Sequence, residues 1–245
     1  MTQQSRLPSS RLGRLLKMGG LASGMAGAAL NNGIKQIARG QRPDINSVML
    51  TPANARRIAA KLAEMRGAAM KIGQLMSLEA GDILPPEITQ QLARLRDEAH
   101  SMTDKQLDGV LQQELGPDWR QRFSYFNPQP IAAASIGQVH EAIDDRGHRL
   151  AVKVQYPGIA DSINSDVDNA MTLMKLFRLL PQGLDIEPLM ETAKQQLHDE
   201  ADYLKEADYL KTYAKLIASE DSFQMPEVID ELSGKRVLSM TYVTG

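Results

Sequence analysis

The sequence contains no cysteine, which excludes disulfide bonds and thiolate metal sites. Aromatic residues make up only 4% of its 245 residues, whereas methionine occurs 13 times. This balance favours a helix-rich protein with adaptable packing over a β-sandwich. Basic and acidic side chains nearly balance, 28 against 30, so the composition gives no sign of nucleic-acid binding.

Several familiar site patterns are also missing. The chain has no P-loop of the form G-x-x-x-x-G-K-[ST] and no G-x-G-x-x-G. No aspartate follows Asp230. The histidines lack the spacing of metal ligands and have no evident nucleophile beside them, so no metal site is predicted; they are His100, His140, His148 and His198. Any nucleotide site must therefore be built on a different pattern.

The N-terminal segment, residues 1–45, differs in charge from the rest. Residues 1–42 carry arginine and lysine but no acidic side chain. An apolar stretch over residues 18–30 is shorter than the roughly 20 residues that span a bilayer, and its glycines weaken a secretory signal. We predict a partly disordered basic arm on an anionic membrane surface; a solvated tail is the alternative. Small residues at four-residue spacing would also let two copies pack as a homodimer: Gly20, Gly24 and Ala28.

The next region, residues 46–120, has helical periodicity. A Thr-Pro start and apolar residues at every third or fourth position predict one amphipathic helix over residues 51–80. A Pro-Pro pair starts a second helix over residues 85–95. Thr103 and Gln106 form a capping box for a third, which a Gly-Pro pair ends. We therefore predict a helical module without strands.

Residues 121–245 change to strand periodicity. Alternation over residues 138–143 and 149–155 predicts two strands, joined by a turn that contains glycine. In the second of them, Lys153 shares a face with Ala151 and Gln155.

Helices and further strands follow. We predict a helix over residues 159–180 and strands over residues 227–230 and 236–243. Between them we predict one long helix that Asp185 caps, with an apolar side made of Leu189, Leu197, Leu204 and Leu210. Together they make a small antiparallel sheet braced by helices, an α+β fold.

Four motifs occur in order along this chain. They are Lys71-Ile72-Gly73-Gln74, the Ala-rich loop Ala132-Ala133-Ala134-Ser135-Ile136-Gly137-Gln138, the strand Ala151-Val152-Lys153, and Glu200-Ala201-Asp202-Tyr203 followed by Glu206. Together they closely resemble the UbiB/ADCK (AarF-type) family of atypical protein-kinase-like proteins, which is tied to ubiquinone biosynthesis. The resemblance covers about residues 45–245. It implies that residues 121–245 form the N-terminal lobe of a kinase-like fold, up to the hinge, with the helical module added before it.

The resemblance implies a site for ATP or ADP in this lobe. Lys153 would touch the phosphates, and Glu206 would orient it. The alternatives are that Lys153 is a surface lysine on an edge strand and that Glu206 is one charge on a solvated helix face. Alanine resists positive φ, so the Ala-rich loop should be stiffer than a Gly-rich loop, with Gly137 alone unrestricted. The residues expected to bind the nucleotide are Ala132, Ala133, Ala134, Ser135, Gly137, Gln138, Ala151 and Lys153.

Lys71 and Gln74 lie three residues apart, on one face of the first helix. The resemblance implies that this helix covers the nucleotide cleft, with Lys71 meeting the acidic pair Glu200 and Asp202. A covered cleft would block a protein substrate and favours a small-molecule or lipid-linked substrate, or ATP hydrolysis. On one continuous helix Glu200 and Glu206 would face different partners. A lysine that snorkels from an amphipathic helix is the alternative for Lys71.

The resemblance places the catalytic aspartate and the magnesium ligands after the last predicted strand. We therefore expect the C-terminal lobe to be absent from this sequence and the chain alone to be inactive, with Mg²⁺ bound only together with that lobe. The function would be that of an ATP-dependent atypical kinase or ATPase of ubiquinone biosynthesis, in a bacterial cytoplasm and peripheral on the inner membrane. A non-catalytic, membrane-associated module that senses nucleotide or lipid is the alternative. The expected partners are an adenine nucleotide, an anionic membrane, and quinone-biosynthesis proteins or a lipid substrate.

Overall fold

The computed structural model describes residues 52–80, 101–176, 185–220 and 222–244, which fall into two compact units. We call them the sheet unit (residues 100–163 and 195–245) and the helical unit (chiefly residues 7–99 and 164–194). The predicted arm and the predicted helix over residues 85–95 lie outside the described residues.

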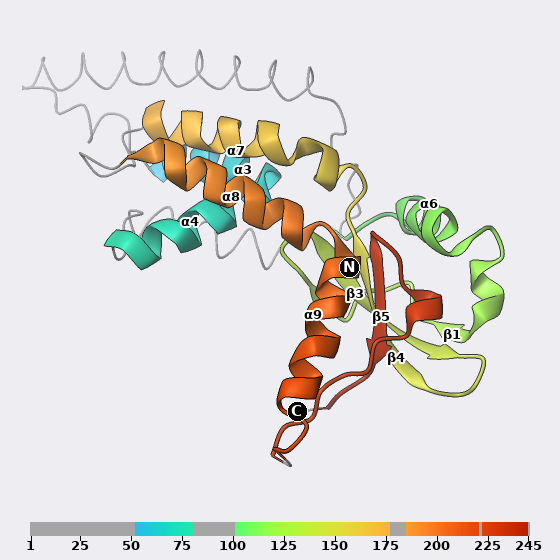
Figure 1. Cartoon of the computed structure of the whole chain (residues 1–245). Helices are drawn as coiled ribbons and strands as arrows, with labels where there is room; N and C mark the ends of the chain where they lie inside the picture. Colours follow the sequence, from blue (N-terminus) through green and yellow to red (C-terminus); the bar gives the residue numbers. More distant parts are fainter. Residues whose placement is uncertain (1–51, 81–100, 177–184, 221, 245) are drawn as a thin grey trace, which may run out of the picture. The chain divides into compact units, whose positions relative to one another are not determined.

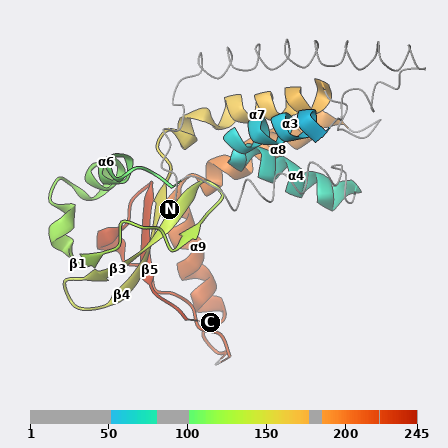
Figure 2. The same ribbon diagram turned by 180° about the vertical axis from the view of Figure 1, so that it is seen from behind.

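The sheet unit is built on antiparallel strands (Figures 1 and 2). The strand order is β1-β3-β4-β5, and a short strand, β2, also pairs with β3. The bounds are β1 (Phe123–Phe126), β2 (Ala132–Ala133), β3 (Gly137–Asp144), β4 (Arg149–Gln155) and β5 (Val237–Thr241). β4 is therefore a central strand, hydrogen-bonded on both sides.

The predicted hairpin is present as β3 and β4. Leu150, Val152 and Val154 are all fully buried, because alternate side chains of β4 point to the same face of the sheet. The connecting turn closes when Asp144 accepts backbone hydrogen bonds, and Gly147 takes a φ of 87°, which favours glycine there.

Two helices pack against the sheet, one from before the strands in the sequence and one from between β4 and β5. Helix α6 (Asp104–Leu115) packs on β4 and β5, and its predicted capping box has both hydrogen bonds. Helix α9 (Tyr203–Leu216) contacts β5 (Figure 1). Two short 3₁₀ helices complete the unit, η1 (Trp119–Arg122) and η2 (Asp230–Leu232).

The prediction of one long helix after Asp185 was wrong. The chain forms α8 (Ile186–Glu200), which the Asp185 carboxylate caps as expected, and then breaks before α9. Asp202 starts the new helix because its carboxylate accepts the backbone N–H of Leu204 at 3.2 Å. The break resets the helical face, so Leu204, predicted to be on the apolar side, is 44% exposed.

One strand prediction was wrong, and one strand was not predicted. Residues 227–230 form no strand: Val228 makes one isolated bridge to Met240, and the chain then turns into η2. Conversely, β1 was not expected. It pairs with β3 through a register shift, and its short burial pattern does not alternate cleanly.

The helical unit contains α3 (Pro52–Glu64), α4 (Arg66–Ala80) and most of α7 (Ile159–Leu176) and α8. The single helix predicted over residues 51–80 was wrong at Met65, whose N–H bonds the carbonyl of Leu62 only three residues back. Lys194 pairs with Asp168 at 3.0 Å and ties α8 to α7. None of the helices in the described ranges is long and apolar enough to span a bilayer.

Candidate nucleotide-binding site

The centre of the candidate site is an ion pair between β4 and α9. The Nζ atom of Lys153 lies 2.7 Å from each carboxylate oxygen of Glu206. The lysine side chain is 19% exposed and the glutamate side chain 34%. Glu206 also lies in the first turn of α9, where the helix dipole favours a negative charge. The structure thus brings together the two residues that were expected to act together; their catalytic role stays a prediction.

The Ala-rich loop is partly a strand. Ala132 and Ala133 form β2 and pair with Val139 and Gln138 of β3. The turn proper is short, and the N–H of Ala134 closes it by donating to the carbonyl of Gly137 at 2.9 Å. The stiffness expected from alanine is therefore reinforced by strand pairing.

Gly137 has a packing role. Its φ lies outside the left-handed region, so conformational freedom is not what this position needs. A Cβ atom here would lie 2.5 Å from the carbonyl oxygen of Val154 and 2.7 Å from the hydroxyl of Tyr203. The conformational freedom expected of Gly137 is therefore not used here, and the lack of a side chain matters because the space beside it is filled from within the protein.

Gln138 is engaged inside the sheet unit. Its side chain is buried, accepts the backbone N–H of Met102 at 3.0 Å and lies 2.8 Å from the Nε2 atom of His140. The other ring nitrogen of His140 lies 2.8 Å from the carbonyl oxygen of Asn127. Burial lowers the pKa of His140, and the Asn127 hydrogen bond opposes this only in part.

His140 should make the stability of the sheet unit depend on pH. Its pKa is lowered by folding from about 6.5, so below that pH the unfolded chain binds more protons than the folded one. The contribution of neutral His140 is complete above about pH 6.5 and is lost as the pH falls. We expect the free energy of unfolding to fall between pH 7 and pH 5.5.

Urea denaturation at both pH values measures this drop, and His140→Gln is the control. The variant is expected to be less stable at pH 7 but to show a flatter pH dependence. An unchanged slope in the variant would assign the pH dependence to other groups.

The acidic pair does not form one surface. The hydroxyl of Ser135 donates to Glu200 at 3.4 Å, whereas Asp202 caps α9. Glu200 and Glu206 do face different partners, Ser135 and Lys153, as expected. The argument from one continuous helix was nevertheless wrong, because α8 ends at Glu200 and α9 starts after Asp202. Lys71, half-buried, and Gln74, exposed, lie on α4 in the helical unit, and their meeting with the acidic pair stays a prediction.

Tyr203 is the residue that sequence reasoning missed. The Nζ atom of Lys153 lies 4.7 Å from the centre of its ring. The side chain is fully buried, and its hydroxyl packs against Gly137. The sequence shows only that tyrosine starts a helix next to the acidic pair, which does not reveal these contacts.

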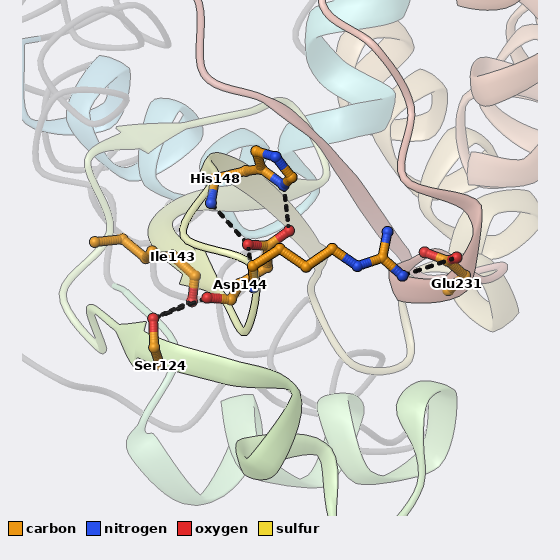
Figure 3. Close-up of polar contacts among 6 residues, drawn as sticks. Ser124, Ile143, Asp144, His148 and Glu231 are labelled. Carbon is orange, nitrogen blue, oxygen red and sulfur yellow. Dashed lines mark hydrogen bonds and ion pairs between the residues drawn. The ribbon is translucent and has the colours of Figure 1, made fainter.

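A separate hollow lies at the opposite end of the strands, beside the β3–β4 turn. It has a volume of about 650 Å³ and is lined in part by Asp144, His148 and Glu231. Burial alone would raise the pKa of Asp144, but hydrogen bonds from the ring and backbone of His148 outweigh it and hold the pKa below its ordinary value. Figure 3 shows these bonds. It also shows the hydrogen bond from the Ser124 hydroxyl to the carbonyl of Ile143 and the ion pair of Arg146, in the turn, with Glu231. These polar groups stabilise the turn and lie away from Lys153.

The family model for the ABC1 atypical kinase-like domain matches residues 94–245. The chain belongs to this family. It is the UbiB/ADCK group that the four motifs indicated, and the antiparallel sheet with its helices belongs to a kinase-like fold.

Curated relatives match almost the whole chain. "Atypical kinase COQ8, mitochondrial" of Saccharomyces cerevisiae is 39% identical over 99% of this chain and 48% of its own length. "Atypical kinase COQ8B, mitochondrial" of Danio rerio is 39% identical over 99% of this chain and 40% of its own. A solved Mycobacterium tuberculosis protein in complex with erythromycin aligns with 75% of this chain and 46% of its own, at 33% identity and a TM-score of 0.49. The chain therefore spans about half the length of the curated relatives it matches or less.

Proposed function

We propose that the sheet unit binds ATP or ADP through Lys153, as the nucleotide-binding part of an atypical kinase or ATPase that supports ubiquinone biosynthesis. The observation that carries the proposal is the ion pair of Lys153 with Glu206. In kinase-like folds a strand lysine held by a helix glutamate contacts the α- and β-phosphates. Membership of the ABC1 family and the similarity to the atypical kinase COQ8 of Saccharomyces cerevisiae support the same function.

The surroundings of Lys153 favour a preformed site. β4 is paired with β3 and β5, so the backbone of Lys153 is fixed on both sides. Glu206 lies on α9, which Asp202 caps. A cation held in place loses little entropy when it meets a phosphate, and the charge-assisted contact is correspondingly strong.

Magnesium chemistry needs further groups. Mg²⁺ takes an octahedral set of oxygen ligands, but the Glu206 carboxylate is engaged by Lys153. No cluster of metal-ligating side chains occurs among the residues that the structure describes. The relatives are about two to three times as long, and we place the magnesium ligands and the catalytic aspartate outside these 245 residues. The 245 residues alone are expected to bind nucleotide without hydrolysing it.

The membrane setting is proposed from the basic composition of residues 1–42. Residues 1–45 would hold the protein peripherally at an anionic membrane, the bacterial inner membrane, facing the cytoplasm. Lys71 and Gln74 would face the nucleotide cleft and favour a small-molecule or lipid-linked substrate over a protein. Quinone-biosynthesis proteins are the expected partners.

Replacing Lys153 with alanine tests the proposal. Binding of a fluorescent ATP or ADP analogue to the 245-residue chain should weaken by about 10- to 100-fold, because a hydrogen bond to a charged group is lost. Lys105→Ala, which removes an exposed lysine from α6, is the matched control and should bind as the unaltered chain does. Equal binding by both variants would refute a nucleotide site at Lys153.

A further inference from the structure

Tyr203 has a buried hydroxyl without a partner. Within the described part of the chain, its oxygen is the one buried side-chain polar atom that makes no hydrogen bond. The side chain is 0% exposed, so water does not reach the hydroxyl from the surface. Leaving such a group unsatisfied is costly, and most buried polar atoms in folded proteins do have a partner. The position of this hydroxyl therefore needs an explanation.

The fold fixes Tyr203 at both ends. Its backbone N–H donates to the carbonyl of Lys235 at 3.1 Å, at the start of α9. Its ring lies beneath the ammonium group of Lys153, with 4.7 Å between Nζ and the ring centre. Its hydroxyl reaches the end of the Ala-rich loop, where the absence of a side chain at Gly137 makes room for it. The residue thus spans from α9 to the loop directly beside the proposed phosphate contact.

The hydroxyl is suited to donate to an anion. Burial raises the pKa of Tyr203 well above its ordinary value, and the charges of Glu206 and Glu200 add to the shift, so the proton stays on. The two nearby carboxylates already have partners: Glu206 is paired with Lys153, and Glu200 accepts from Ser135. A donor next to a lysine that binds phosphate has one obvious acceptor, an oxygen of that phosphate.

We propose that the Tyr203 hydroxyl is a positioning group for the phosphates of a nucleoside di- or triphosphate held by Lys153. Because the hydroxyl is buried, the phosphates reach it only when the turn at Ala134–Gly137 shifts. The backbone N–H of Tyr156 holds that turn by donating to the carbonyl of Ile136 at 3.0 Å, and the bond from Ser135 to Glu200, at 3.4 Å, is long for hydroxyl to carboxylate. Tyr203 then gains its partner as the nucleotide enters, which links the position of the loop to occupancy of the site. The inference rests on the proposed function.

Tyr203→Phe tests it, because phenylalanine keeps the ring and removes only the oxygen. The 245-residue chain should bind ATP and ADP analogues about tenfold more weakly, equivalent to about 1.4 kcal/mol. Its melting temperature without nucleotide should be equal to or above that of the unaltered chain, since an unsatisfied hydroxyl has been removed. Affinity for adenosine, which has no phosphate, should not change. Tyr213→Phe makes the same chemical change at an exposed position on α9 and should alter neither property.

The outcomes separate this inference from the proposed function. If Lys153→Ala loses the nucleotide but Tyr203→Phe binds as tightly as the unaltered chain, the inference is wrong and the proposed function stands. A lower melting temperature of Tyr203→Phe with unchanged binding would assign the hydroxyl to an internal water, which also overturns it. Failure of the unaltered chain to bind ATP or ADP would remove both together.

Discussion

Alanine at position 137 is expected to destabilise the sheet unit by about 2 to 3 kcal/mol, although it adds a single methyl group. The new Cβ would lie 2.5 Å from the carbonyl oxygen of Val154, a backbone atom of a strand that is paired on both sides. It would also lie 2.7 Å from the Tyr203 hydroxyl and 3.2 Å from the Cα atom of Gln155. None of these is the free end of a flexible chain, so the strands have to separate. Urea denaturation followed by the fluorescence of the single tryptophan, which lies in the same unit, measures the loss.

Gly109→Ala is the matched control for this change. Gly109 lies inside α6, and an added Cβ would meet no atom within 4 Å. Alanine there should stabilise the unit by about 0.5 to 1 kcal/mol, the opposite sign. In a Tyr203→Phe background the loss at position 137 should be smaller, because the contact with the Tyr203 hydroxyl at 2.7 Å is gone. A Gly137→Ala variant as stable as the unaltered chain would contradict the packing of the loop end described here.

The sequence was sufficient where structure is set locally. The β3–β4 hairpin follows from alternation and a glycine turn, and the capping box of Thr103 and Gln106 is complete within four residues. Both depend on neighbours in the chain, so both could be predicted from the chain alone. The pairing of Lys153 with Glu206 was different: it joins distant segments and came from the family resemblance.

The break between α8 and α9 could not be predicted in this way. The carbonyl of Ala201 accepts from the side chain of Gln155, and the N–H of Tyr203 donates to Lys235. These bonds from distant segments satisfy backbone groups that a continuous helix would have paired internally. The leucine spacing continues across the break, so the local pattern gives no warning of it.

The role of Tyr203 was hidden for the same reason. In sequence it is one tyrosine at a helix start, and nothing nearby distinguishes it from the exposed Tyr209 and Tyr213 on the same helix. Its burial and its contacts with Gly137 and Lys153 depend on the docking of α9 against the sheet. Only the folded unit shows that a hydroxyl is left without a partner beside the candidate site.

Trp119→Ala is expected to cost about 3 to 5 kcal/mol, a loss comparable with the whole stability of many domains. Trp119 is 3% exposed and meets Phe123 and Phe126 edge to face, with ring centres 6.1 and 5.1 Å apart. Few aromatic residues occur in the chain, so the rest of the unit has little to fill the space that this ring leaves. Circular dichroism during urea denaturation measures the effect, since the fluorescent probe is removed.

Trp119→Phe separates the two contributions of this residue. Phenylalanine keeps most of the apolar contact but loses the hydrogen bond from the indole N–H to Asp108, at 3.0 Å, so the loss should fall to about 1 to 2 kcal/mol. The aromatic cluster of Trp119, Phe123 and Phe126 also contacts β3. Phe126 stacks on His140 with 5.3 Å between ring centres, and His140 contacts Gln138. Nucleotide affinity at low urea should nevertheless change little in the phenylalanine variant, since neither Lys153 nor Tyr203 touches the cluster. A phenylalanine variant as unstable as the alanine variant would show that the hydrogen bond to Asp108, and not the packing of the ring, provides the stability that Trp119 contributes.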